Sequence, residues 1–272
     1  MNAEELKKTA RRYGADLVGI APAERFKGLP ADASPVSIFP ECRSVIVVGR
    51  RILRGSLRGI EEGTNFNSTY GTFGYQWLED NFLSRTTYEL NLYIEENGYE
   101  GVPLFGYHPE GMPKGRPVEP GKPAPNVIVD PYVAARNAGL GTIGKGGFFI
   151  TPEFGTRQRF AMLLTDAELE PDAVSETDPC AGCEACLAAC PFGAITPEGV
   201  DYRVCAKCPN GAMLGPGRGS RPDRIAAACG RACLVRLEQN GLCENSFKEE
   251  FRKREPWATD LFNRPVNQEA VI

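Results

Sequence analysis

The chain has 272 residues, of which 42% are hydrophobic and 24% are charged, a composition that is ordinary for a folded globular protein. This length is enough for one large domain, or for one medium and one small domain. The formal net charge of −4 excludes a broadly basic protein, so binding to nucleic acid is not expected.

The N-terminal segment MNAEELKKTARRYGADLV carries charges throughout and lacks the apolar run of a signal peptide. Arg11 and Arg12 do not form a twin-arginine export signal, because no hydrophobic run follows them. No stretch of the sequence approaches the roughly 18–20 apolar residues that span a bilayer. We therefore expect a soluble, cytoplasmic protein that does not bind membranes.

The first part of the chain predicts alternating helices and strands. Asn2 and Glu5 form a capping-box pattern that predicts an N-terminal helix. The spacing of Leu78, Phe82, Tyr88 and Leu92 predicts a long helix over residues 77–97, which ends before a glycine. Short apolar runs bounded by glycine and proline predict strands at residues 15–22, 44–50, 102–107, 126–130 and 159–166.

A proline- and glycine-rich stretch, HPEGMPKGRPVEPGKPAP, is too long for a simple connection and is therefore a candidate lid. An acidic linker follows the last predicted strand and leads into a cysteine-rich segment. The sequence thus predicts an α+β protein with an α/β body (1–172), a small metal-bearing module (173–245) and a C-terminal tail (246–272).

The stretch GLGTIGK at residues 139–145 contains a G-x-G-x-x-G pattern. A dinucleotide-binding fingerprint needs a strand before the glycines and a helix after them. Here PYVAARNA predicts a helix upstream, and GGFFIT predicts a strand downstream. The order is reversed, so the glycines are interpreted as a tight turn.

Nine of the ten cysteines lie between Cys180 and Cys243, which argues for metal rather than disulfides. The first four, in CAGCEACLAACP, follow the bacterial ferredoxin spacing for a 4Fe–4S cluster. Structural zinc uses two separated pairs of ligands, so four cysteines within this short run favour iron–sulfur.

The remaining cysteines are less regular. Two clusters need eight thiolates, and the economical assignment gives one cluster Cys180, Cys183, Cys186 and Cys233, and the other cluster Cys190, Cys205, Cys208 and Cys229. A four-cysteine zinc ribbon made by Cys205, Cys208, Cys229 and Cys233 is the alternative. Cys243 is left over in both, and Cys42 is interpreted as a small buried residue.

The segment AGLGTIGKGGFFITPEFGTRQRFAMLLTDAELEPD, followed by CAGCEACLAACPFGAI, resembles the superfamily of epoxyqueuosine reductases and reductive dehalogenases. The likeness implies a nitroreductase-like α/β body that binds a base-off corrinoid, followed by a ferredoxin-like module whose two 4Fe–4S clusters supply electrons. It also implies that the glycine turn passes close to the nucleotide tail of the cobalamin. The expected contact residues are Gly139, Gly141, Gly144, Lys145, Thr151, Pro152 and Gly155.

The sequence departs from these families in two places. It ends soon after the cysteine-rich module, so the helical repeats with which epoxyqueuosine reductases hold tRNA are not expected. The run CGRACLVRLE also differs from the second cysteine motif of those enzymes, which leaves the ligands of the second cluster open.

Reduction of a carbon centre needs an acid, and the resemblance implies one near the glycine turn. Asp130 is the first candidate, although it can instead cap the helix that begins at Pro131. Tyr132, Tyr107 and His108 are the further candidates. His108 is the single histidine, which excludes triads and metal sites built on several histidines.

These features predict an iron–sulfur oxidoreductase that passes electrons from two clusters to a corrinoid and on to a small organic substrate. Two alternatives stay open: an electron carrier or reductive activator of another corrinoid protein, and a flavin-dependent iron–sulfur reductase. The expected partners are a low-potential electron donor, such as a ferredoxin or flavodoxin, and a small-molecule substrate.

Overall fold

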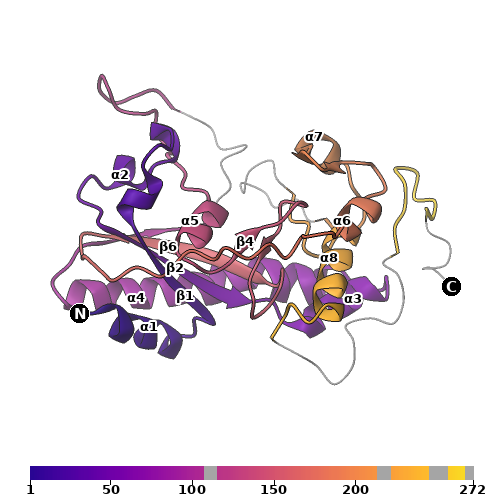
Figure 1. Ribbon diagram of the computed structural model, residues 1–272, viewed down its shortest axis with the longest axis horizontal. Helices are drawn as coiled ribbons and strands as arrows, with labels where there is room; N and C mark the ends of the chain where they lie inside the picture. Colours follow the sequence, from indigo (N-terminus) through magenta and orange to yellow (C-terminus); the bar gives the residue numbers. More distant parts are fainter. Residues whose placement is uncertain (107–114, 213–221, 245–256, 267–272) are drawn as a thin grey trace.

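The structure is a computed structural model, and it describes residues 1–106, 115–212, 222–244 and 257–266. It has the mixed α/β architecture that the sequence predicts, with a central sheet, helices on both faces and a smaller C-terminal part (Figure 1). Among the described residues, no helix is long and apolar enough to cross a membrane.

The central sheet has four antiparallel strands in the order β1 (Leu17–Pro22), β2 (Ser44–Arg51), β6 (Gln158–Thr165) and β3 (Gly101–Leu104). The register places Ile46 of β2 between Ile20 of β1 and Leu163 of β6. All eight residues of β6 are buried, because both faces of the sheet are covered. The strands predicted at residues 15–22, 44–50 and 159–166 are confirmed.

Two helices, α1 (Ala3–Arg12) and α4 (Ser84–Glu96), cover one face of the sheet, and α5 (Pro131–Asn137) lies on the opposite face (Figure 1). Leu6 and Leu90 pack against Ile46 on the first side, whereas Ala134 packs with Val47 on the second. The capping box of α1 is present, since Asn2 and Glu5 bond each other's backbone N–H groups.

The helix predicted over residues 77–97 differs from the structure. A π-helical segment runs over Asn67–Gln76 and a second over Leu78–Leu83, and the regular α-helix α4 begins only at Ser84. Of the four residues whose spacing predicted the helix, Leu78 is buried, whereas Phe82, Tyr88 and Leu92 are exposed. The buried positions of α4 include threonine and asparagine as well as leucine and isoleucine, so the apolar pattern pointed to the wrong face.

The strand predicted at residues 126–130 does not form. Asn126 has a φ of 66°, which interrupts an extended chain, and the N–H of Ile128 donates to the carbonyl of Asp32 rather than to a neighbouring strand. The edge of the sheet is occupied by β3, which ends at Leu104, three residues earlier than predicted.

The remaining body elements are short. They are the 3₁₀ segments Ala23–Phe26, Ala31–Ala33 and Arg54–Leu57, the helices α2 (Pro35–Ile38) and α3 (Arg58–Glu61), and a hairpin of β4 (Thr142–Ile143) and β5 (Phe149–Ile150). Strand β4 lies within the glycine motif and β5 follows it, so the predicted order is confirmed for α5, the glycine turn and the strand in GGFFIT.

The C-terminal part contains α6 (Ala185–Ala188), β7 (Ile195–Thr196), β8 (Gly199–Val200), α7 (Tyr202–Cys205) and α8 (Ala228–Gln239). These helices lie together at one end of the body (Figure 1). Ile225, Ala226 and Leu234 share a buried apolar cluster with Ile60 and Tyr70 of the body. The cysteine-rich segment therefore packs on the body through a common core.

Candidate functional site

Eight cysteines border two separate cavities, four around each. The first cavity is bordered by Cys180, Cys183, Cys186 and Cys233. The second is bordered by Cys190, Cys205, Cys208 and Cys229. In each group, three cysteines come from the segment between residues 180 and 208, and the fourth comes from α8.

The electrostatic neighbours of the thiols divide in the same way. Burial raises the pKa of Cys233 well above its usual range, and Cys186, Cys180 and Cys183 raise it further. Burial raises the pKa of Cys229 to about 12, against an opposing effect of Arg224. Thiols buried in this way need a positive charge to ionise, and the irons of a cluster supply such a charge.

Each cavity therefore offers the donor set of a 4Fe–4S cluster. Two groups around the second cavity can also stabilise thiolate sulfur, because the N–H of Ala194 donates to Cys190 Sγ at 3.3 Å and the amide of Asn210 donates to Cys208 Sγ at 3.5 Å. The arrangement groups the cysteines as the economical two-cluster assignment does, and their role as ligands stays a prediction.

The zinc alternative is less compatible with this geometry. It requires Cys233 beside the other three ribbon cysteines, whereas Cys233 borders the first cavity and Cys205, Cys208 and Cys229 border the second. Within the described ranges, no three Cys, His, Asp or Glu side chains are arranged around a position for one metal ion.

The glycine turn lies against the first cysteine cavity. Gly144, Lys145 and Gly146 border this cavity. A Cβ atom at Gly144 would lie 2.8 Å from Cys180 Sγ, and one at Gly146 would lie 3.0 Å from Cys186 Sγ. Lys145 Nζ donates to the carbonyl of Cys183 at 3.3 Å. The close approach of backbone to thiols explains why this segment is rich in glycine.

The other residues expected to contact a corrinoid lie within the body. Gly139 and Gly141 have φ values of 74° and 152°, and a Cβ at either position would strike a backbone carbonyl. Thr151 is fully buried, and its hydroxyl accepts from the N–H of Phe154. Pro152 accepts from the N–H of Glu244, and a Cβ at Gly155 would lie 2.7 Å from Cys243 Sγ.

A third, central cavity of about 60 Å³ lies between the body and the C-terminal part. None of the seven predicted corrinoid contacts borders it, although their neighbours Gly147 and Phe148 do. Its polar lining consists of Tyr75, Glu79, Tyr132, Arg159, Tyr202, Asp223 and Arg224.

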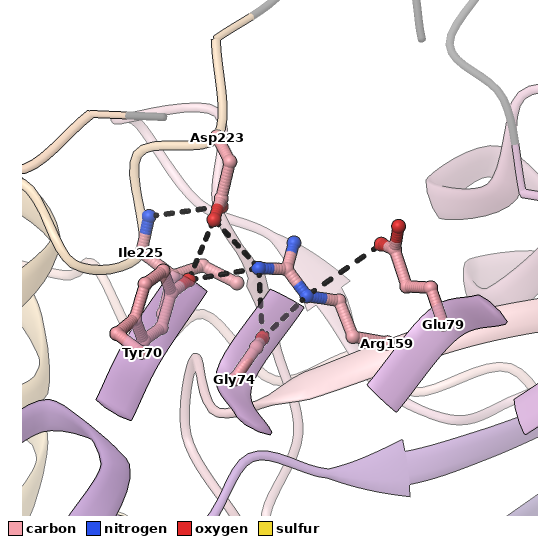
Figure 2. A network of polar contacts seen from close by, with 6 residues as sticks. All are labelled: Tyr70, Gly74, Glu79, Arg159, Asp223 and Ile225. Carbon is pink, nitrogen blue, oxygen red and sulfur yellow. Dashed lines mark hydrogen bonds and ion pairs between the residues drawn. The ribbon is translucent and has the colours of Figure 1, made fainter. Parts of the chain in front are cut away.

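A buried ion-pair network forms one wall of the central cavity (Figure 2). Arg159 Nη2 lies 2.6 Å from Asp223 Oδ2 and 2.8 Å from the hydroxyl of Tyr70, which itself donates to Asp223. Glu79 lies 3.6 Å from Arg159 Nε, and the carbonyl of Gly74 accepts from the same guanidinium. Burial opposes the charge of Arg159, but Asp223 raises its pKa above the usual range, so the guanidinium stays charged.

The candidate acids are placed differently from one another. Asp130 caps α5, with Oδ1 accepting from the N–H groups of Tyr132 at 2.8 Å and Val133 at 3.2 Å, and it does not border the central cavity. Tyr132 does border the cavity, and burial raises its pKa to about 12. Tyr107 and His108 lie outside the described residues. The cap interpretation of Asp130 is confirmed, and its role as an acid stays a prediction.

The ion-pair network was not predicted from the sequence. One signal was present: Arg159 directly precedes the apolar run Phe160–Leu164 of β6, and a charged side chain buried beside such a run needs a partner. Asp223 lies 64 residues further along the chain, so the sequence alone does not identify it as that partner.

No protein-family model matches the chain. Curated relatives do match. A tetrachloroethene reductive dehalogenase of Desulfitobacterium hafniense is 27% identical over 237 residues, covering 71% of this chain and 38% of the relative. An epoxyqueuosine reductase of Synechococcus is 46% identical over 72 residues, covering 26% of this chain and 22% of the relative. This chain is homologous to both families. The resemblance inferred from the sequence is therefore confirmed.

Solved structures show the same fold. A reductive dehalogenase, described as suggesting a mechanism for B12-dependent dehalogenation, matches with a TM-score of 0.56 at 18% identity, covering 91% of this chain and 38% of that one. An epoxyqueuosine reductase with an epoxyqueuosine-modified tRNA stem loop matches with a TM-score of 0.52 at 16% identity, covering 84% of this chain and 65% of that one. The homologues are reductases, and this chain spans less than half the length of the dehalogenases.

Proposed function

We propose that this protein is an iron–sulfur reductase in which two 4Fe–4S clusters deliver electrons to an acceptor at the central cavity. In this proposal, residues 173–245 form a ferredoxin-like module on a nitroreductase-like body. The acceptor that the homology favours is a corrinoid, although the described cavity is too small to enclose a corrin ring, and the compound finally reduced is a small organic substrate. A low-potential donor such as a ferredoxin or flavodoxin supplies the electrons.

The observation that carries the proposal is that each cysteine cavity shares a lining residue with the central cavity. Phe148 borders both the first cysteine cavity and the central cavity. Arg224 borders both the second cysteine cavity and the central cavity. Bound clusters would supply single electrons at low potential, and both would lie within one side chain of the central cavity.

The support for a corrinoid is the homology to reductive dehalogenases. The described central cavity has room for only a few water molecules, so it does not enclose a corrin ring.

The protein's own residues supply a proton donor and a fixed set of polar side chains at the central cavity. Tyr132, with its raised pKa, keeps its hydroxyl protonated at neutral pH and borders the cavity. Arg159 compensates the charge of Asp223, and Glu79 adds a second carboxylate to this wall, so the wall presents no net positive charge to a bound substrate. The proposal assigns proton donation to this side of the cavity, with Asp130 as the competing donor.

The experiment is an anaerobic titration of the cluster-loaded protein with cobalamin and, separately, with a flavin, followed by absorption spectroscopy. Bound cobalamin that is reduced by the protein supports the proposal. Binding of flavin alone indicates a flavin-dependent reductase. Binding of neither, with reduction of a separate corrinoid protein, indicates an electron carrier or activator.

A further inference from the structure

Arg224 lies between the second cysteine cavity and the central cavity. Only 5% of the residue is exposed. Its guanidinium carbon lies 4.7 Å from the centre of the Phe148 ring and 5.3 Å from the centre of the Tyr202 ring. Two aromatic faces thus hold a buried positive charge in a fixed position.

The neighbours of Arg224 do not explain this charge by themselves. Burial opposes the charge of Arg224, and the titratable groups beside it include Cys229, Tyr202 and Cys205, which are neutral as free thiols and a phenol at physiological pH. Its Nη1 atom is buried and has no hydrogen-bond partner within the described part of the chain. Burying a guanidinium without an anion costs free energy, so a negative group beside Cys205 and Cys229 would stabilise this arrangement.

A cluster held by four thiolates meets this requirement. It carries a net negative charge, and reduction by one electron makes that charge more negative without forming or breaking a bond. A cation fixed beside it favours the reduced form, and charge and burial around a cluster set its reduction potential. The effect is large here because the cation is shielded from solvent.

Among the described residues that border the first cysteine cavity, no buried cation corresponds to Arg224. Its cations are Lys145 and Arg236, and both side chains are exposed to solvent. Water and salt screen exposed charges, so these two residues affect a cluster less than a buried guanidinium does.

The position of Arg224 is fixed through its neighbours. Asp223, the preceding residue, is tied to the body by Arg159 and Tyr70 (Figure 2). The carbonyl of Arg224 accepts from the N–H of Ala227 at the start of α8. The body therefore sets where the Arg224 charge stands relative to the cysteines.

We propose that Arg224 raises the reduction potential of the cluster held by Cys190, Cys205, Cys208 and Cys229, which makes it the higher-potential cluster and the one that gives electrons to the central cavity. This inference rests on the proposed function, because it requires two clusters. In this role Arg224 acts through its charge on the potential of the cluster and itself takes up neither an electron nor a proton.

The test is a redox titration of the anaerobic protein, followed by electron paramagnetic resonance. Arg224→Gln removes the charge, Arg224→Lys keeps it, and Arg236→Gln removes an exposed charge beside the first cavity. A Cys186→Ser background, which retains only the second cluster, assigns the signals. Iron content measured on every sample shows first whether two clusters are present.

We expect Arg224→Gln to shift the second cluster to lower potential, Arg224→Lys to keep most of the wild-type value, and Arg236→Gln to change either cluster little. If Arg224→Gln does not fold, the wild-type ordering decides, with the second cluster at the higher potential. An unchanged potential in Arg224→Gln, or a lower wild-type potential for the second cluster, overturns the inference. A wild-type protein without two clusters refutes the proposed function instead.

Discussion

Removal of the Asp223 carboxylate is the sharpest perturbation of the interface between the body and the cysteine-rich part. Asp223 and Arg159 form an ion pair of 2.6 Å with side chains only 5% and 9% exposed. Asp223→Ala leaves the guanidinium buried, with Glu79 at 3.6 Å as the remaining carboxylate. Breaking a buried pair costs about 3–5 kcal/mol, and we expect the lower end because Glu79 partly compensates.

Thermal unfolding of the anaerobic, cluster-loaded protein measures this cost. For a chain of this size about 1 kcal/mol corresponds to roughly 2–4 °C, so the midpoint should fall by about 6–12 °C. The matched control is Glu89→Ala, which breaks the exposed pair of Arg85 and Glu89 at 3.3 Å. That pair is worth about 0.3–0.5 kcal/mol, so its loss should be barely measurable.

The comparison separates burial from the mere presence of an ion pair. Iron content must be equal in the variants, so that loss of a cluster is not mistaken for loss of the pair. Equal midpoints for Asp223→Ala and Glu89→Ala would refute the conclusion that the Arg159–Asp223 pair holds the two parts of the chain together.

The other expected outcomes concern a helix cap, the glycine turn and a free thiol. Asp130→Ala should lower the free energy of unfolding by about 0.5–2 kcal/mol in denaturant titrations, whereas a fall in turnover by about 10²–10⁴ for Asp130→Asn would identify it as the acid. Gly141→Ala should destabilise the protein equally with and without cobalamin, because its Cβ would strike the carbonyl of Ile150; a loss seen only with cobalamin would contradict this. Burial raises the pKa of Cys243 to about 11. Its alkylation at pH 8, measured by mass spectrometry, should therefore be roughly 100-fold slower than that of a free thiol. The rate should increase as the pH approaches 11. Alkylation as fast as a free cysteine would show that the thiol is accessible and ionised.

The elements predicted correctly are those that local sequence specifies. Strands β1 and β2 are short Val- and Ile-rich runs between glycine and proline, and α1 begins with side chains that bond its own first turn. Where tertiary contacts decide, the prediction failed. Residues 126–130 have the composition of a strand, but the positive φ of Asn126 and the presence of β3 at the sheet edge prevent pairing.

The candidate site was predictable in part. The ferredoxin spacing identified the first run of cysteines, because three ligands of one cluster must lie within a short loop. The glycine turn was expected at the nucleotide tail of a corrinoid, which stays a prediction, and the structure places Gly144 and Gly146 against the first cysteine cavity instead. The central cavity was not foreseen, since Arg159 and Asp223 meet only when distant segments pack together.

Analysis of iron, sulfide and zinc in the anaerobically purified protein, with Cys186→Ser and Cys229→Ser beside the wild type, tests the central claim most directly. The two groups of four cysteines predict about eight irons and eight sulfides per chain, and loss of about half of each in either variant. About four irons with one zinc in the wild type would contradict the account, as would complete loss of iron in Cys186→Ser.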